Sequence, residues 1–189
     1  MKTYIFDSDY PYGSKSYVLE ADGEFAIIDP SVSPSKVFSS LNINPSEFKY
    51  IILTHAHFDH FLTVDDWCDA TNLPVWVGEK DAESLKDSTL NCYLYFLGIN
   101  KAFKGKICTL SKEDKLRLGA CELEIFETPG HSPGSITVKF GSALFVGDVF
   151  FPGGAIGRTD LPGGNYCELL ASIKKISELK GCTEFYSGH

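Results

Sequence analysis

The sequence lacks the long apolar run that a membrane-spanning helix requires. Residues 1–9 carry acidic side chains where a secretory signal has an apolar stretch. The sequence also has no run of basic residues. Its 17 Lys and Arg are outnumbered by 25 Asp and Glu, for a formal net charge of −8. Such a chain is a poor match for the phosphate backbone of nucleic acid. We therefore expect a cytoplasmic protein without a membrane or nucleic-acid partner.

The six cysteines include no Cys-x-x-Cys pair, and none lies beside a histidine motif. Without a secretory signal, this pattern indicates free buried thiols more than a disulfide framework or a thiolate zinc site. The sequence has no internal repeat, low-complexity tract or linker. Its 189 residues, 43% of them hydrophobic, predict a single domain over residues 1–189 with a core of its own.

Short runs typical of β-strands recur along the chain, with helical segments between several of them. The expected strands cover residues 4–6, 16–20, 25–29, 50–54, 74–77, 122–128, 136–140, 143–148 and 184–187. The expected helices cover residues 34–41, 62–71, 79–86 and 166–180, and residues 87–103 are expected to form a helix plus a loop. Asn165 is placed to cap the last of these helices, and Gly181 follows it.

All five histidines fall in short motifs, which leaves none for ordinary packing. Residues 54–60 read Thr-His-Ala-His-Phe-Asp-His, His131 follows Pro-Gly, and His189 follows a glycine. Asp148 closes the apolar run 143–148. These motifs follow the ends of expected strands, and strand ends meet at the edge of a sheet. The pattern predicts a metal centre with nitrogen and oxygen ligands, which suit zinc, iron or manganese.

The same motifs, with Pro-Gly-His-Ser-Pro-Gly-Ser at 129–135, resemble in order the motif series of the metallo-beta-lactamase superfamily. Residues 147–151 and 157–164 are most similar to the small, single-domain glyoxalase II-like (hydroxyacylglutathione hydrolase-like) enzymes. The resemblance implies a mixed α/β fold, a four-layer αββα sandwich. Relatives continue past the last histidine motif, so we expect that a C-terminal tail is missing.

The resemblance also implies two divalent metal ions, with zinc favoured over iron or manganese. The implied ligands form two sets and a bridge: His55, His57 and His131 for one ion, Asp59, His60 and His189 for the other, and Asp148 between them. Asp29 is implied as a structural residue beneath the site. Arg158 and Tyr93 are candidate substrate-binding residues, although Arg158 is equally suited to a salt bridge with Asp160. Aromatic residues such as Tyr93 are more often part of a core.

The resemblance implies a metal-dependent hydrolase that cleaves an acyl thioester by attack of a metal-bound hydroxide, which Asp59 orients. The positive charge of the ions favours a small, anionic thioester as substrate. A mononuclear iron persulfide dioxygenase on the same fold and a non-catalytic binding module stay open as alternatives. β-Lactam hydrolysis is disfavoured, because antibiotic-hydrolysing relatives commonly carry cysteine where Asp148 stands.

Overall fold

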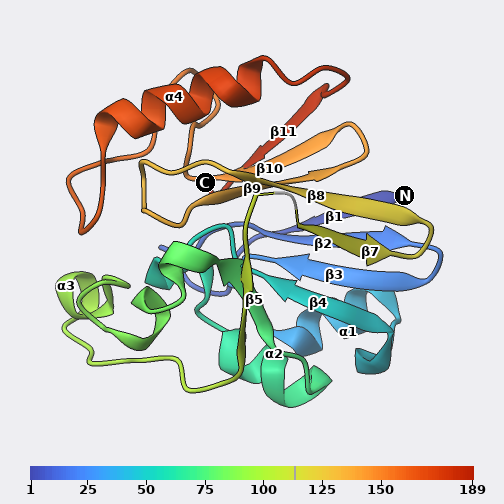
Figure 1. Cartoon of the computed structure of the whole chain (residues 1–189). Coiled ribbons are helices and arrows are strands. Elements are labelled where there is room, and N and C mark those ends of the chain that lie inside the picture. The colour runs from blue at the N-terminus through green and yellow to red at the C-terminus, as the bar shows by residue number, and fades with distance from the viewer. Residues whose placement is uncertain (113) are drawn as a thin grey trace.

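Over residues 1–112 and 114–189, which the computed structural model describes, two β-sheets lie face to face between helices (Figure 1). The first sheet has the strand order β1-β2-β3-β4-β5-β6, which are, in turn, Lys2–Phe6, Ser16–Ala21, Glu24–Ile28, Phe48–Ile52, Val75–Gly78 and Ile107–Leu110. The second has the order β11-β10-β9-β8-β7, which are, in turn, Glu184–Ser187, Ala143–Gly147, Ile136–Phe140, Cys121–Glu127 and Lys115–Leu118.

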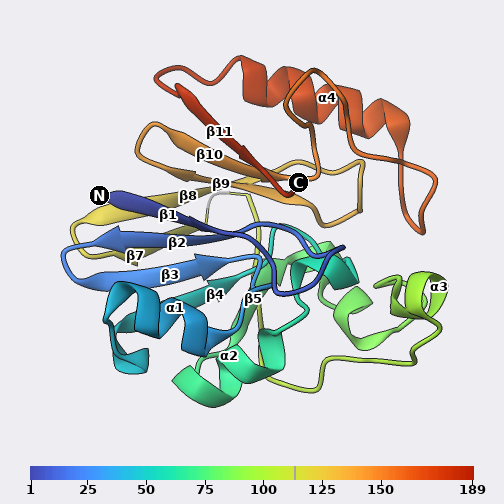
Figure 2. The same cartoon turned by 180° about the vertical axis from the view of Figure 1, so that it is seen from behind.

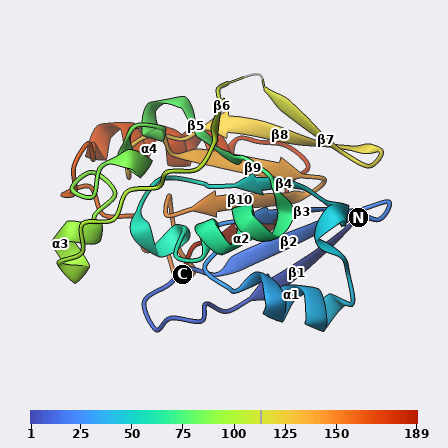
Figure 3. The ribbon, with the colours of Figure 1, turned by 90° about the horizontal axis from the view of Figure 1, so that it is seen from below.

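Helices cover the outer face of each sheet, which gives the four layers of an αββα sandwich (Figures 1 and 2). α1 (Pro34–Leu41) and α2 (Val64–Thr71) cover the first sheet, and α4 (Tyr166–Ser177) covers the second. Figure 3, seen from below, shows α1 and α2 in front of the first sheet and α3 (Tyr93–Leu97) apart from them at one end. The architecture expected from the sequence is therefore confirmed.

Alternation along the strands explains why the sheets are buried on both sides. In β3, Phe25 and Ile27 pack toward the helices, whereas Ile28 packs into the core between the sheets. In β10, Phe145 joins that same central core and Leu144 packs against α4. Because successive side chains of a strand point to opposite faces, such apolar runs are the pattern of a strand covered on both sides.

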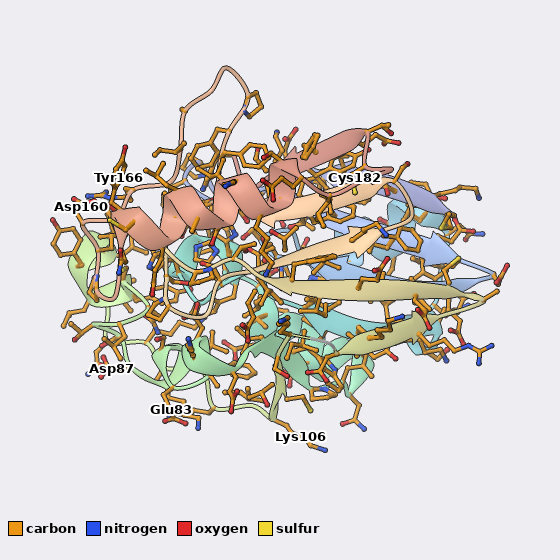
Figure 4. All side chains as sticks on the ribbon, turned by 45° about the horizontal axis from the view of Figure 1, so that its top comes forward. Glu83, Asp87, Lys106, Asp160, Tyr166 and Cys182 are labelled. Carbon is orange, nitrogen blue, oxygen red and sulfur yellow. The ribbon has the colours of Figure 1, made fainter. Side chains whose placement is uncertain are left out.

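α4 is the helix whose boundaries the sequence marks best. The side chain of Asn165 accepts hydrogen bonds from the backbone N–H groups of Cys167 and Glu168, at 3.0 and 3.2 Å. This is the expected N-cap, which satisfies donors that the first turn leaves free. The helix ends at Ser177, three residues before the expected end. Figure 4 shows it crossing the second sheet from Tyr166 toward Cys182.

The segment 79–86 does not form the expected α-helix. It makes two separate 3-10 turns, Glu79–Asp81 and Ser84–Lys86. The backbone N–H of Ala82 bonds to the carbonyl of Glu79, and that of Asp87 to the carbonyl of Ser84, so the bonds span three residues instead of four. The segment does not form the α-helix that its sequence favours because the side chain of Asp81 points into the protein, as described below.

Within residues 87–118, the expected helix plus loop is confirmed and two unexpected strands follow it. The helix expected within 87–103 is short, because it begins after Cys92 in a left-handed conformation (φ 68°) and ends at Gly98 (φ 65°). The strands β6 and β7 were not expected. They are only four residues long each, and β7 alternates charged and apolar residues at the edge of its sheet.

One edge of the sandwich collects the ends of strands from both sheets. β3, β4 and β5 are parallel, as are β10 and β11, and the motifs of interest follow β3, β4, β8, β10 and β11. A hydrogen bond of 2.8 Å from the N–H of Ile136 to the carbonyl of Thr54 joins the two sheets at this edge. No helix among the described residues is long and apolar enough to cross a membrane.

Candidate metal centre

Three histidine rings converge where the loop after β4 meets the loop after β8. Nδ1 of His57 lies 2.8 Å from Nε2 of His131, and the latter atom lies 3.2 Å from Nε2 of His55. All three side chains are buried. Ring nitrogens this close to one another have room for a cation that they share, and the three residues are placed to hold one metal ion.

A second group lies beside the first. Nε2 of His189 is 3.1 Å from a carboxylate oxygen of Asp59, and Nε2 of His60 is 4.0 Å from the same oxygen. One oxygen of Asp148 lies 3.3 Å from Nε2 of His60, and its other oxygen lies 3.7 Å from Nε2 of His131. Asp148 therefore faces both groups, as the expected bridge would. The assignment of these seven side chains as ligands stays a prediction.

Unsatisfied polar atoms test whether the site fits metal ions. Among the residues that the structure describes, the buried side-chain nitrogen and oxygen atoms without a hydrogen-bond partner are His57 Nε2, His60 Nε2 and Asp148 Oδ1. The last two face each other at 3.3 Å within the cluster, whereas Nε2 of His57 lies on the side of its ring away from the Nδ1 that faces His131. A buried polar atom without a partner is costly, so the pair of His60 and Asp148 indicates a missing partner between them. Imidazole and carboxylate donors fit divalent transition metals.

The electrostatics of the cluster point to the same conclusion. Burial, together with nearby His131, lowers the pKa of His57 to about 3. Burial and the neighbouring imidazoles hold the pKa of His55 well below its ordinary value. Burial would also lower the pKa of His60, but the charges of Asp29 and Asp148 raise it well above the usual range. The two histidines are therefore neutral and ready to ligate, while the carboxylates around His60 attract a cation.

Asp29, which follows β3, orients two of the histidines. Its Oδ2 accepts hydrogen bonds from His60 Nδ1 at 2.8 Å and from the hydroxyl of Thr54 at 2.7 Å. The Thr54 hydroxyl in turn lies 3.2 Å from Nδ1 of His55. These contacts favour a proton on Nδ1 of both rings and turn each Nε2 toward the cluster. The structural role expected for Asp29 thus takes the form of one carboxylate that positions two candidate ligands.

Asp81 has a similar role that sequence reasoning missed. It is fully buried, and its carboxylate accepts hydrogen bonds from the N–H of Ala56 (3.0 Å), the N–H of Gly134 (2.7 Å) and the hydroxyl of Ser132 (2.7 Å). It therefore joins the loop of His55 and His57 to the loop of His131. An acidic residue in an expected helix is ordinarily a surface residue. The available signal was its position just after β5, at the edge where the ligands gather.

His189 reaches the cluster because the residue before it is glycine. A Cβ on Gly188 would lie 2.2 Å from Asp148 Oδ1 and 2.5 Å from Cε1 of His60. The backbone of Gly188 is held by hydrogen bonds to the carbonyl of Gly147 (2.9 Å) and from the N–H of Lys15 (2.7 Å). The last strand can therefore deliver an imidazole only with glycine at this position. The side chain of His189 is 40% exposed, more than any other candidate ligand.

A pocket of about 270 Å³ opens beside the candidate ligands. Apart from them, it is lined by Tyr12, Phe58, Phe96, Leu161 and Arg158. Arg158 lies there as expected, and it also forms the bidentate salt bridge with Asp160, at 2.8 and 2.7 Å, that the sequence left as an alternative.

Tyr93 does not line this pocket, in contrast to the expectation. Its ring is 3% exposed and packs against Phe58 and Phe61 in the core, with Lys101 over its face. Phe96, one turn further along α3, lines the pocket instead. The direction of a side chain on so short a helix follows from its packing, and the aromatic run in the sequence has no period that would reveal it.

Comparison with known proteins places this geometry in a family. The family model described as the metallo-beta-lactamase superfamily matches residues 9–189. The probable metallo-hydrolase YqgX of Bacillus subtilis is 36% identical over 95% of this chain and 86% of its own length. The hydroxyacylglutathione hydrolase GloC of Haemophilus influenzae is 29% identical over 92% of this chain and 84% of its own.

Solved structures agree with the sequence relatives. The B3 metallo-beta-lactamase BLEG-1 has a TM-score of 0.86 and 34% identity, and the match covers 100% of this chain and 91% of that one. TTHA1623, solved in a di-iron-bound form, has a TM-score of 0.81 and 31% identity, over 97% and 90% of the two chains. Family, fold and the clustered histidines and carboxylates lead to one conclusion. The chain belongs to the metallo-beta-lactamase superfamily and is a metal-dependent hydrolase.

Proposed function

We propose that the protein hydrolyses acyl thioesters, with two divalent metal ions at the cluster and zinc as the favoured metal. The observation that carries the proposal is the placement of Asp148 between two groups of three ligands: Nε2 of His60 faces its Oδ1 at 3.3 Å, and Nε2 of His131 and of His189 face its Oδ2 at 3.7 and 3.8 Å. The similarity to GloC supports a thioester as the substrate class. The substrate is a small molecule that enters the pocket beside the ligands.

The candidate ligands divide into two sets in this proposal. His55, His57 and His131 would hold one ion, Asp59, His60 and His189 the other, and Asp148 would contact both. Divalent ions at such a site lower the pKa of a bound water and polarise a carbonyl oxygen. Hydrolysis then adds the oxygen of water to the acyl carbon and breaks the carbon–sulfur bond, which yields a carboxylic acid and a thiol.

Asp59 is the residue to which we assign the orienting role. Burial would raise its pKa, but the hydrogen bond from His189 and the charge of His60 lower it below the ordinary value. The side chain is therefore an ionised acceptor at neutral pH, and it faces the pocket. It can hold a water proton so that the oxygen points to the acyl carbon. A thiolate leaves readily, because the pKa of its conjugate acid is about 8.5, so a dedicated proton donor is not needed.

The test uses the full chain loaded with zinc and an acyl thioester such as lactoylglutathione, with thiol release as the readout. We expect hydrolysis that is lost on chelation, returns with zinc, and falls at least about 100-fold in His55→Ala and Asp59→Asn. Asp65→Asn is the control, because Asp65 pairs with Lys101 on the surface at 3.1 Å. Hydrolysis that survives chelation and both substitutions would refute the proposal.

Two other activities have specific support and belong in the same assay. β-Lactam hydrolysis is supported by the 34% identity to a B3 metallo-beta-lactamase, against the sequence-based expectation. An iron-dependent enzyme is supported by the di-iron-bound form of a 31% identical relative, and a persulfide dioxygenase with one iron stays open as the alternative raised by the sequence. A chromogenic cephalosporin tests the first. Oxygen consumption by the iron-loaded protein with a persulfide tests the second.

A further inference from the structure

The wall of the pocket beyond the candidate ligands is aromatic. Tyr12 packs on Phe58 with ring centroids 5.9 Å apart, and Phe58 stacks on Phe96 of α3 at 5.5 Å. Phe58 is buried, whereas Tyr12 and Phe96 remain 43% and 44% exposed. Rings that stay this exposed at the mouth of a pocket offer apolar surface that a ligand can cover.

Charge at the same mouth is balanced within the protein. Among the described residues that line the pocket, Arg158 is the single Lys or Arg. Its Nε and Nη2 atoms bond to the two carboxylate oxygens of Asp160, and the guanidinium lies 5.6 Å from the centroid of Phe96. This pairing lowers the pKa of Asp160 to about 2, so Asp160 is ionised at neutral pH. A substrate carboxylate would have to displace Asp160 to gain the same bidentate partner.

We propose that the thioester cleaved here carries an uncharged hydrocarbon or aryl group, which covers Tyr12, Phe58 and Phe96 while the carbonyl lies at the candidate ligands. This inference rests on the proposed function and names its substrate class. It differs from the sequence-based expectation of an anionic substrate, which took account of the ions and not of the residues around the pocket mouth. The apolar group stands on the acyl side or on the thiol side of the thioester, and the experiment separates the two.

The experiment uses the zinc-loaded full chain and two series of neutral thioesters. One series keeps N-acetylcysteamine as the thiol and lengthens the acyl group from acetyl to butyryl and hexanoyl. The other keeps the acetyl group and lengthens an alkyl thiol. We expect kcat/KM to rise about twofold to fourfold per added methylene in at least one series. Lactoylglutathione, whose glutathione carrier bears charged groups, is expected to be a poorer substrate than hexanoyl-N-acetylcysteamine.

A pair of phenylalanine variants locates the apolar contact. Phe96→Ala is expected to lower the ratio of kcat/KM for the longest and shortest members of the responsive series by about tenfold. Phe185→Ala is the matched control, because Phe185 is 49% exposed and does not line the pocket. Its ratio should equal that of the unmodified chain. The use of a ratio cancels a general loss of active protein in either variant.

A third variant tests the charge balance. Asp160→Asn releases the Arg158 guanidinium without changing the aromatic wall. We expect kcat/KM for lactoylglutathione to rise about threefold, because the partly exposed cation then has no internal carboxylate partner. The neutral thioesters should be unaffected. A rise that is equal for neutral and charged substrates would contradict the inferred role of the pair.

The results also separate this inference from the proposed function. If thioesters are cleaved but kcat/KM is flat along both series, or highest for charged substrates, the apolar preference is wrong and the hydrolase proposal stands. An unchanged ratio in Phe96→Ala equally overturns it. If the zinc-loaded protein cleaves none of the thioesters, the proposed function fails and the inference fails with it.

Discussion

The carboxylate of Asp29 links candidate ligands that the proposed function assigns to different metal ions. It contacts His60 directly and reaches His55 through the hydroxyl of Thr54. Asp29 itself has a left-handed backbone (φ 52°), which turns the chain at the end of β3 so that the side chain points under the cluster. One residue therefore sets the orientation of imidazoles in both groups.

Replacement of Asp29 by asparagine tests this link. The amide of asparagine has one oxygen and one NH₂ group. If the NH₂ group takes the place of Oδ2, it cannot accept the hydrogen bonds from His60 and Thr54. We expect zinc affinity to fall about tenfold to 100-fold, as for other residues that orient ligating histidines. Competition with a chromophoric chelator measures the affinity, with Asp65→Asn as the control. Unchanged affinity for both ions would show that Asp29 does not position them.

The sequence identified the residues of the cluster better than those around it. His55, His57 and His60 stand together in the chain, and their motif carries its own signal. Asp81, by contrast, acts through backbone groups of two loops distant in the sequence, and apart from its position just after β5 nothing local distinguishes it from a surface carboxylate. Tyr93 and Phe96 are both aromatic residues of α3, and only the packing of that helix decides which of the two side chains points to the pocket.

At the scale of elements, alternation and capping made most of the sandwich predictable. The pattern of β3 and β10 requires cover on both faces, and Asn165 marks the beginning of α4. The segment 79–86 was predicted incorrectly because tertiary contacts of Asp81 override its local helical preference. Strand order could not be predicted, since β7 and β11 are set at opposite edges of one sheet by contacts far apart in the sequence.

The turn after β5 is expected to support the loops of His57 and His131 through Asp81. Asp81→Asn removes acceptor capacity from a buried group that now serves three donors, and should lower the free energy of unfolding by about 1.5–3 kcal/mol. It should also weaken the ion held by His55, His57 and His131, seen as a changed absorption spectrum with cobalt. Ser132→Ala, which removes one of the three donors, should have a smaller effect on both. Equal effects from the two variants would contradict this account.

At the scale of the whole molecule, the metal-free protein has to hold opposed charges at one edge of the sandwich. His55 and His57 are buried as neutral rings with lowered pKa values, whereas His60 keeps its proton between two carboxylates. An unfolded histidine titrates near pH 6.5. The two effects therefore act on stability in opposite directions on either side of that pH.

We expect the stability of the metal-free protein to be greatest near pH 6.5. Below pH 6.5, His55 and His57 bind protons in the unfolded chain but stay unprotonated in the folded protein. Stability is therefore lost as the pH falls from 6.5 toward 3. Above pH 6.5, the unfolded chain releases a proton that folded His60 retains, so stability falls as the pH rises toward the higher pKa of His60. Urea unfolding at pH 5, 6.5 and 8.5 measures the loss of stability on both sides of the maximum.

With zinc bound in place of the His60 proton, the loss of stability at alkaline pH should vanish. If that loss persists with zinc, the result would argue against metal binding at His60.

The central claim, a two-ion thioester hydrolase, is tested most directly by titrating the chelated protein with zinc while thioester hydrolysis is followed. The account predicts no hydrolysis without metal, and a rate that reaches its plateau at two zinc ions per chain, one for each candidate ligand set. A plateau at one ion, or hydrolysis before any zinc is added, would contradict it.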